Sequence, residues 1–342
     1  MKRTVLLLSI FLLATLISGW VNLAAAQQTG KVYRIGFLRF FPGPPRSTGP
    51  LHIAFRQRLR ELGYVEGQNL VIEERGVKHS GSRSAQAAKV AAEMVQLKLD
   101  VIVTMPGATV TSEFVRATRT IPIVMPGLRA DPVEEGFVMS LARPGGNVTG
   151  LTNLNSKLYA KRLQLLKETF PRMSRVSFLT TPSQRRRSLE QIEAVGQALG
   201  IQIQSLNVTR VHHLERAFSA ILHTDRAQPR EGLRGLLVAS SRHIRRHRAR
   251  VIEFAAKRRL PAMYDGSRFV DAGGLMYYGT DLVEIRRRTA NYVDRILKGA
   301  NPGDLPIEQS TNFHFFINLK TAKQLGVTIP PAVLYQATKV IK

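Results

Sequence analysis

The chain has 342 residues, of which 44% are hydrophobic and 22% charged, and it contains no cysteine. The length suits two domains, and the composition is that of a globular protein, which excludes a disordered tail or a fibre. The absence of cysteine excludes disulfide bonds, a thiol nucleophile and a cysteine-ligated metal centre. Lysine and arginine number 50 against 24 acidic residues, and the net charge of +26 raises nucleic acid, anionic surfaces and acidic ligands as partners.

The first 26 residues have the pattern of a secretory signal peptide. Lys2 and Arg3 precede an apolar run at residues 5–17, which is too short to span a membrane, and alanines at residues 24–26 form a cleavage site. We therefore expect an exported, periplasmic protein that is cleaved after Ala26.

The positive charge is divided among separate arginine clusters at residues 185–187, 242–250 and 286–288. None of these clusters is accompanied by aromatic stacking residues or by a known nucleic-acid-binding module. Together with the export signal, this pattern predicts no nucleic-acid partner. Solvated helix faces and the recruitment of an anionic ligand both remain open as explanations of the charge.

From residue 32 the sequence alternates short apolar strands with amphipathic helices. In the first half we predict strands at residues 32–38, 69–74, 101–103 and 121–125, and helices at 51–62, 85–97 and 108–117. Near-continuous apolar strands in β-α-β-α order predict a parallel sheet that is covered by helices on both faces.

The pattern restarts after a glycine-rich join at residues 145–152. We predict helices at 160–170, 189–199, 214–222 and 251–259, and strands at 176–180, 201–206, 235–239 and from 261. The last part holds a long helix at 282–297, an extended run at 305–317 and a short C-terminal helix, which together are too small for a domain and should complete the two sheets. The predicted fold class is α/β, with two doubly wound parallel-sheet lobes.

Several segments go beyond fold class and resemble one family, in order along nearly the whole chain after the signal peptide. They are residues 61–69, 131–133, 140–150, 272–279, 292–300, 305–309 and 317–322. The resemblance is to the ABC transporter substrate-binding proteins that include the tryptophan- and tyrosine-type binding proteins, with a periplasmic binding protein type I-like fold.

The resemblance implies two lobes joined by three crossovers, with a small-molecule ligand between them and an ABC permease in the inner membrane as partner. Lobe 1 would comprise residues 31–150 plus about 280–305, and lobe 2 residues 151–279 plus about 306–342. The second crossover would lie near residues 271–280, where Gly273, Gly274 and Gly279 suit a hinge. We expect a monomer that performs no chemistry.

In doubly wound sheets the ligand lies beyond the carboxyl ends of the strands, where helix N-termini offer unpaired N–H groups. In lobe 1, Arg39 could pair with a ligand carboxylate and Phe40 or Phe41 could stack on a planar ligand. Gly107, Ala108 and Thr109 open a helix that could hold a carboxylate. The resemblance also places Thr104 in this loop. Asp131 could accept from a ligand amine, and Thr152 lies in the first crossover.

In lobe 2 the strand ends offer the hydroxyl groups of Thr181, Ser183 and Ser241. Tyr264 could stack on the ligand, and Asp265 could accept from an amine. Each of these positions also suits a helix cap or a turn. The predicted ligand is an amino acid or a similar small carboxylate.

Enzyme and metal motifs are absent from the sequence: there is no G-x-S-x-G, H-E-x-x-H, P-loop or G-x-G-x-x-G. His243 and His247 have the spacing of two metal ligands on a helix, but the surrounding arginines oppose a cation. We therefore expect no cofactor and no metal. The alternatives are a sensory protein that presents its ligand to a membrane receptor and, on weaker grounds, a secreted hydrolase of the same fold.

Overall fold

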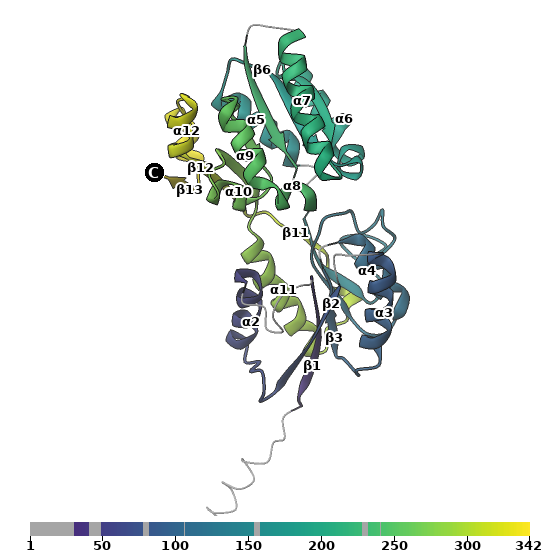
Figure 1. The fold of residues 1–342 in the computed structure, drawn as a ribbon. Helices are drawn as coiled ribbons and strands as arrows, with labels where there is room; N and C mark the ends of the chain where they lie inside the picture. Colours follow the sequence, from purple (N-terminus) through teal and green to yellow (C-terminus); the bar gives the residue numbers. More distant parts are fainter. Residues whose placement is uncertain are drawn as a thin grey trace, which may run out of the picture.

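The structure is a computed structural model, and it describes residues 31–40, 49–77, 82–105, 107–153, 158–227, 232–239 and 241–342. The predicted signal peptide lies outside these residues. The chain forms two α/β lobes, one above the other in Figure 1, each with one central sheet. The fold class predicted from the sequence is confirmed.

Lobe 1 contains a sheet of six strands that all run parallel to their neighbours. Across the sheet the strands are β11 (Glu308–Gln309), β5 (Val148–Thr152), β4 (Ile123–Leu128), β3 (Val101–Val103), β1 (Tyr33–Phe40) and β2 (Leu70–Val77). The central strands β3 and β4 are buried along their whole length, which accounts for their uninterrupted apolar sequence.

Two hydrophobic clusters cover the two faces of this sheet. One cluster includes Met94 from α3 (Arg83–Val95) and Phe114 from α4 (Ala108–Ala117). The other includes Phe55 and Leu59 from α2 (Pro50–Glu61) and Val293 from α11 (Leu282–Leu297), which lies beside α2 in Figure 1. Lobe 1 therefore recruits a helix from far along the chain to complete its core.

Lobe 2 contains a sheet of seven strands, parallel except for one pair. Across the sheet they are β13 (Lys339–Ile341), β12 (Phe313–Asn318), β10 (Met276–Thr280), β9 (Ala262–Tyr264), β8 (Leu233–Val238), β6 (Met173–Thr180) and β7 (Gln202–Asn207). The pair β10–β12 is antiparallel because the chain leaves lobe 2 at the end of β10 and returns at that same end to begin β12.

Helices cover both faces of this second sheet as well. One face is covered by α5 (Leu158–Thr169), α6 (Pro182–Ala198), α12 (Leu319–Leu325) and α13 (Pro331–Gln336). The other face is covered by α7 (Val211–Ala227), α8 (Arg242–Arg246), α9 (Arg248–Lys257) and α10 (Ser267–Asp271). Each lobe thus has a core of its own on both sides of its sheet.

The chain crosses between the lobes three times, and the crossing segments are hydrogen-bonded to one another. The Thr280 hydroxyl donates to Asn153 Oδ1 at 2.8 Å, and the N–H of Asp281 donates to the Asn312 carbonyl at 3.0 Å. The N–H of Ser310 donates to the Thr152 carbonyl at 3.4 Å. The first crossover therefore begins after β5, so Thr152, which was predicted to lie in the crossover, is the last residue of that strand.

Two details of the predicted organisation are wrong. Glu308–Gln309 belongs to lobe 1, not lobe 2, because it pairs with β5 at the edge of the first sheet. Gly273 and Gly274 lie in the turn between α10 and β10, inside lobe 2, and Gly279 lies within β10, so none of the three is a crossover residue. Gly273 has φ of +100°, which explains a glycine in this turn without invoking a hinge.

Candidate functional site

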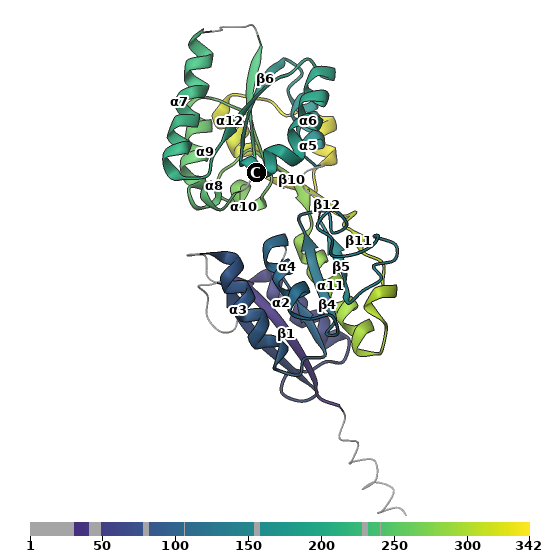
Figure 2. The ribbon, with the colours of Figure 1, turned by 90° about the vertical axis from the view of Figure 1, so that its right-hand side faces the viewer.

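The strand order of each sheet reverses at one point, and the two reversal points face each other. In lobe 1 the order reverses between β1 and β3, and in lobe 2 between β6 and β8. Ligands of open α/β sheets bind beyond the carboxyl ends of the strands at such points. Helices α8 and α10, which follow β8 and β9, lie at the end of lobe 2 that faces lobe 1 (Figures 1 and 2). We call the residues at these facing ends the interlobe site. They include Ala108 and Thr109 of lobe 1 and Asp265 of lobe 2.

The N-terminus of α4 is the carboxylate site that the sequence predicts in lobe 1. Gly107 is the N-cap, with φ of −141° and ψ of 125°, and no side chain caps the helix. Within the described part of the chain, no acceptor lies opposite the N–H groups of Ala108 and Thr109. The predicted carboxylate cradle therefore has both N–H groups and the positive end of the helix dipole available.

Thr104 belongs to the same loop but is buried. The Thr111 hydroxyl donates to Thr104 Oγ1 at 3.3 Å, so Thr104 fixes the loop before α4 from inside. Its predicted contact with the ligand does not fit this burial, whereas the Thr109 side chain is exposed.

Asp265 is an acidic residue of the interlobe site. It follows β9, and its Oδ2 accepts a hydrogen bond from the Tyr159 hydroxyl at 2.8 Å. Burial raises the pKa of Tyr159 well above its usual value, and the nearby charge of Asp265 raises it further. Tyr159 is thus a permanent donor that orients the Asp265 carboxylate. The prediction that Asp265 accepts from a ligand amine is compatible with this position.

Arg162, one turn along α5 from Tyr159, is a buried cation that the sequence did not single out. Its side chain is 0% exposed, its Nε donates to the Tyr278 carbonyl at 2.7 Å, and its guanidinium lies 4.7 Å from the centroid of the Tyr159 ring. Arg162 therefore ties α5 to β10 directly beneath the Tyr159–Asp265 pair. The apolar periodicity of α5 gives no signal for it.

Arginine side chains also lie near the interlobe site. Burial and, as a smaller cause, repulsion from Arg129 together lower the pKa of Arg286 to about 10. Desolvation also lowers the pKa of Arg245, with repulsion from Arg129 adding to the shift and attraction to Asp265 opposing it. Arg129 of lobe 1 is therefore within electrostatic range of Arg245 in lobe 2. Sequence reasoning missed Arg129 and treated the other two only as parts of surface clusters.

Arg39 has a carboxylate partner within the protein. It is 8% exposed at the end of β1, and its Nε lies 3.3 Å from Glu74 Oε2 on β2, so the protein itself supplies its carboxylate.

Burial and the nearby cations, led by Arg286, lower the pKa of His52 to about 4, which keeps this histidine neutral at pH 7. The Phe40 side chain and all of Phe41 lie outside the described part of the chain.

Most of the predicted hydroxyl contacts are instead structural. Thr181 caps α6 by accepting from the Gln184 N–H, and Ser241 caps α8 by accepting from the Ile244 N–H. The Thr152 hydroxyl donates to the Leu128 and Ala130 carbonyls, at 3.0 and 3.3 Å. The Ser183 side chain is not among those described.

Two further residues that were predicted to contact the ligand make contacts within the protein instead. Asp131 accepts from the Val133 N–H at 2.9 Å, which makes it a turn residue. The prediction that Tyr264 stacks on a ligand is wrong. Its ring is 0% exposed and stacks on Phe269 at 4.7 Å between centroids, so no face of the ring is left for a ligand.

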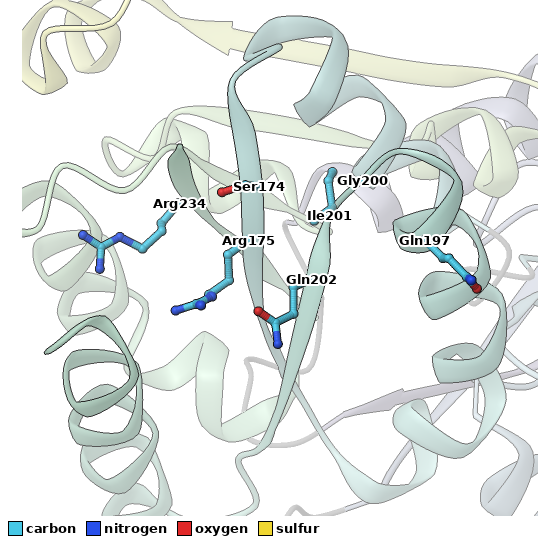
Figure 3. A pocket seen from close by; sticks show the side chains of 7 residues that line it. All are labelled: Ser174, Arg175, Gln197, Gly200, Ile201, Gln202 and Arg234. Carbon is cyan, nitrogen blue, oxygen red and sulfur yellow. The ribbon is translucent and has the colours of Figure 1, made fainter. Parts of the chain in front are cut away.

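A polar hollow in lobe 2 lies outside the interlobe site. Figure 3 shows it at the amino ends of β6, β7 and β8, which is the end of the sheet that faces away from lobe 1. Its lining residues are Ser174, Arg175, Gln197, Gly200, Ile201, Gln202 and Arg234. By the rule for parallel sheets this is not the ligand end.

None of the helices in the described residues is both long and apolar enough to cross a membrane. Likewise, no group of three or more histidine, aspartate or glutamate side chains in this part of the chain is arranged to hold a metal ion.

The sequence is similar to those of known binding proteins. Residues 52–341 match the family model of the ABC transporter substrate binding protein. A tyrosine-binding protein of Clostridioides difficile is 23% identical over 275 residues, which cover 80% of this chain and 75% of that protein.

Solved structures agree on the fold. A conserved domain protein from Vibrio cholerae superposes with a TM-score of 0.74 at 27% identity and covers 91% of this chain and all of that chain. A Streptococcus ABC domain in complex with L-Trp also has a TM-score of 0.74, at 23% identity, over 90% of this chain and 99% of that one.

Proposed function

This chain belongs to the family of ABC transporter substrate-binding proteins, and we propose that it binds an amino acid or a related small carboxylate between its lobes. We propose further that it is exported, acts as a monomer without performing chemistry, and delivers its ligand to an ABC permease in the inner membrane. The observation that supports the ligand class is the pairing of an uncapped helix N-terminus in lobe 1 with a carboxylate, Asp265, in lobe 2.

The two halves of an amino acid match these two elements. The α-carboxylate would accept hydrogen bonds from the N–H groups of Ala108 and Thr109, where the helix dipole favours negative charge. The α-ammonium would donate to Asp265, which Tyr159 holds in place. Because one element belongs to each lobe, a ligand that engages both stabilises a closed arrangement of the lobes. The tyrosine- and tryptophan-binding relatives support the same ligand class.

Replacing Ala108 with proline tests the carboxylate end. Proline is tolerated at the first position of a helix, and the extended backbone of Gly107 suits the residue before a proline, so α4 should form as before. The variant lacks one N–H that would donate to a charged acceptor. We expect binding of the amino acid that gives the largest thermal shift among the standard L-amino acids to weaken roughly tenfold, measured by calorimetry.

The matched control is Ala108→Gly, which changes the same residue but keeps its N–H, and it should bind within about twofold of the unmodified protein. If Ala108→Pro is folded and binds with unchanged affinity, the ligand carboxylate is not held at α4. The exported state has a separate test in cell fractionation. Recovery of the chain in the cytoplasm with its first 26 residues intact would overturn it.

A further inference from the structure

Arg162 is a charged residue within the apolar side of α5. Its side chain is fully buried, and its helix neighbours Leu163, Leu165 and Leu166 belong to the hydrophobic core of lobe 2. Removing a guanidinium group from water is costly, and replacing buried ionic groups by well-packed apolar residues often leaves stability unchanged or raises it. The stability of the fold therefore gives no reason for an arginine at this position.

The contacts of Arg162 lead to the interlobe site through Tyr159. The two residues are three apart on α5, so they lie on the same side of the helix. The Arg162 guanidinium lies 4.7 Å from the centroid of the Tyr159 ring, and the centroid of the Phe178 ring lies 5.1 Å from it. These contacts hold the ring in place. They thereby fix the direction of the Tyr159 hydroxyl, which donates to Asp265 Oδ2 at 2.8 Å.

The charge of Arg162 also acts on this hydrogen bond. Burial and the charge of Asp265 raise the pKa of Tyr159, whereas the charge of Arg162 opposes this rise. A cation near an aromatic ring makes a phenol more acidic, and a more acidic phenol is a stronger hydrogen-bond donor to an ionised acceptor. Arg162 therefore strengthens the hold of Tyr159 on the Asp265 carboxylate.

A second contact of Arg162 connects the same group of residues to the crossovers. Its Nε donates to the Tyr278 carbonyl on β10 at 2.7 Å. This strand ends two residues later at Thr280, whose hydroxyl donates to Asn153 in the first crossover. The contacts of Arg162 thus run from the Asp265 carboxylate to the strand by which the chain leaves lobe 2.

We infer that Arg162 is a positioning residue for the ligand ammonium group, which acts on Asp265 through Tyr159 and does not touch the ligand itself. This inference rests on the proposed function and deepens it, because it names the residues by which the protein selects amino acids over the same acids without the amine. A carboxylate that is already held in one orientation loses no rotamer freedom when it binds an ammonium group, so it binds that group more tightly.

The test measures how strongly each variant prefers an amine. The amino acid that gives the largest thermal shift among the standard L-amino acids is titrated calorimetrically, alongside the same molecule with hydrogen in place of the amine. Tyr159→Phe loses only a hydroxyl, and Arg162→Gln loses the charge but keeps a donor for the Tyr278 carbonyl. In each variant the affinity for the amino acid should fall roughly tenfold, while the affinity for the amine-free analogue stays within about twofold.

The same substitutions are then made in Asp265→Ala. With no carboxylate to position, Tyr159→Phe and Arg162→Gln should each change the affinity for the amino acid by less than about twofold. A residue that supports the fold without acting through Asp265 would weaken binding equally in both backgrounds. That result, or an equal loss of affinity for the amino acid and its analogue, overturns the inference.

Two matched controls remove the same groups away from the interlobe site. Tyr64→Phe removes a buried hydroxyl that donates to Asp294 at 3.0 Å, and the Tyr64 ring contacts Tyr33 at the amino end of β1. Arg175→Gln removes a buried arginine near the amino end of β6. Both variants should bind the amino acid and its analogue within about twofold of the unmodified protein.

A melting curve for each variant separates a loss of binding from a loss of folding. If Arg162→Gln does not fold, Arg162→Met takes its place, because methionine suits the apolar side of α5 and also lacks the charge. The same selective loss of affinity for the amino acid is expected.

The failure of this inference is distinguishable from the failure of the proposed function. If Ala108→Pro and Asp265→Asn weaken the amino acid while Tyr159→Phe and Arg162→Gln bind it normally, only the positioning role is wrong. If the unmodified protein binds the amino acid and its amine-free analogue equally, Asp265 does not contact the ammonium group and the role of Arg162 is wrong with it. If no amino acid binds, the proposed ligand class is wrong as well.

Discussion

Replacing Gly150 with alanine is expected to destabilise lobe 1 by about 3–5 kcal/mol, from backbone strain and overpacking together. Gly150 lies in the middle of β5 with φ of +123°, a conformation that side chains rarely adopt. A Cβ there would lie 2.5 Å from the carbonyl oxygen and 2.6 Å from the nitrogen of Met125 on the neighbouring strand β4. Because these are backbone atoms of a buried strand, neither can move without breaking the sheet.

The expected readout is a fall of the melting temperature by roughly 10 °C, measured by calorimetry or circular dichroism. Gly146→Ala is the matched control. It lies four residues away, and a Cβ at this position would meet no atom within 4 Å. Gly146→Ala should melt within about 2 °C of the unmodified protein. Equal melting temperatures for the two variants would mean that β5 does not have this backbone conformation.

Replacing Asp265 with asparagine is expected to weaken binding of an amino acid roughly tenfold to a hundredfold. Asparagine keeps the shape of the side chain and can still accept the hydrogen bond from Tyr159, but it removes the negative charge that would pair with the ligand ammonium. It also removes the charge that attracts Arg245. The measurement is calorimetric titration of the same ligand into both proteins.

Two controls isolate the charge of Asp265. Asp304→Asn makes the same change at an exposed residue of the short helix Pro302–Asp304, and it should leave affinity unchanged. An analogue of the ligand that lacks the amine should lose nothing when Asp265 is replaced. If the analogue and the amino acid lose affinity equally in Asp265→Asn, the carboxylate does not contact the ligand ammonium.

The fold was predictable because each lobe repeats one simple pattern. Helices α4 and α11 have the predicted bounds, and most strands lie within about three residues of their predicted ranges. Strand β5 and the edge strand β11 were not predicted as strands. The first contains Gly150 between two threonines, and the second has only two residues, so neither carries a periodic apolar signal.

Candidate site residues could be predicted from the sequence only where they lie at the end of a strand or at the start of a helix. Strand ends and helix starts can be located from the sequence, and this rule selected Ala108, Thr109 and Asp265. The same rule also selected Thr181, Ser241 and Asp131, which are caps and turn residues, because capping and ligand binding require the same residue types at the same positions. The burial of Tyr264 and of Arg162 depends on packing between elements, which the sequence does not show.

The central claim is that a small ligand binds between the two lobes and draws them together. Small-angle X-ray scattering of the protein, with and without a saturating amount of the amino acid that gives the largest thermal shift, tests this claim most directly. The ligand engages α4 in lobe 1 and Asp265 in lobe 2, so it must favour a closed arrangement, and the radius of gyration should fall on binding. An unchanged radius of gyration with a saturating, tightly bound amino acid would contradict the account.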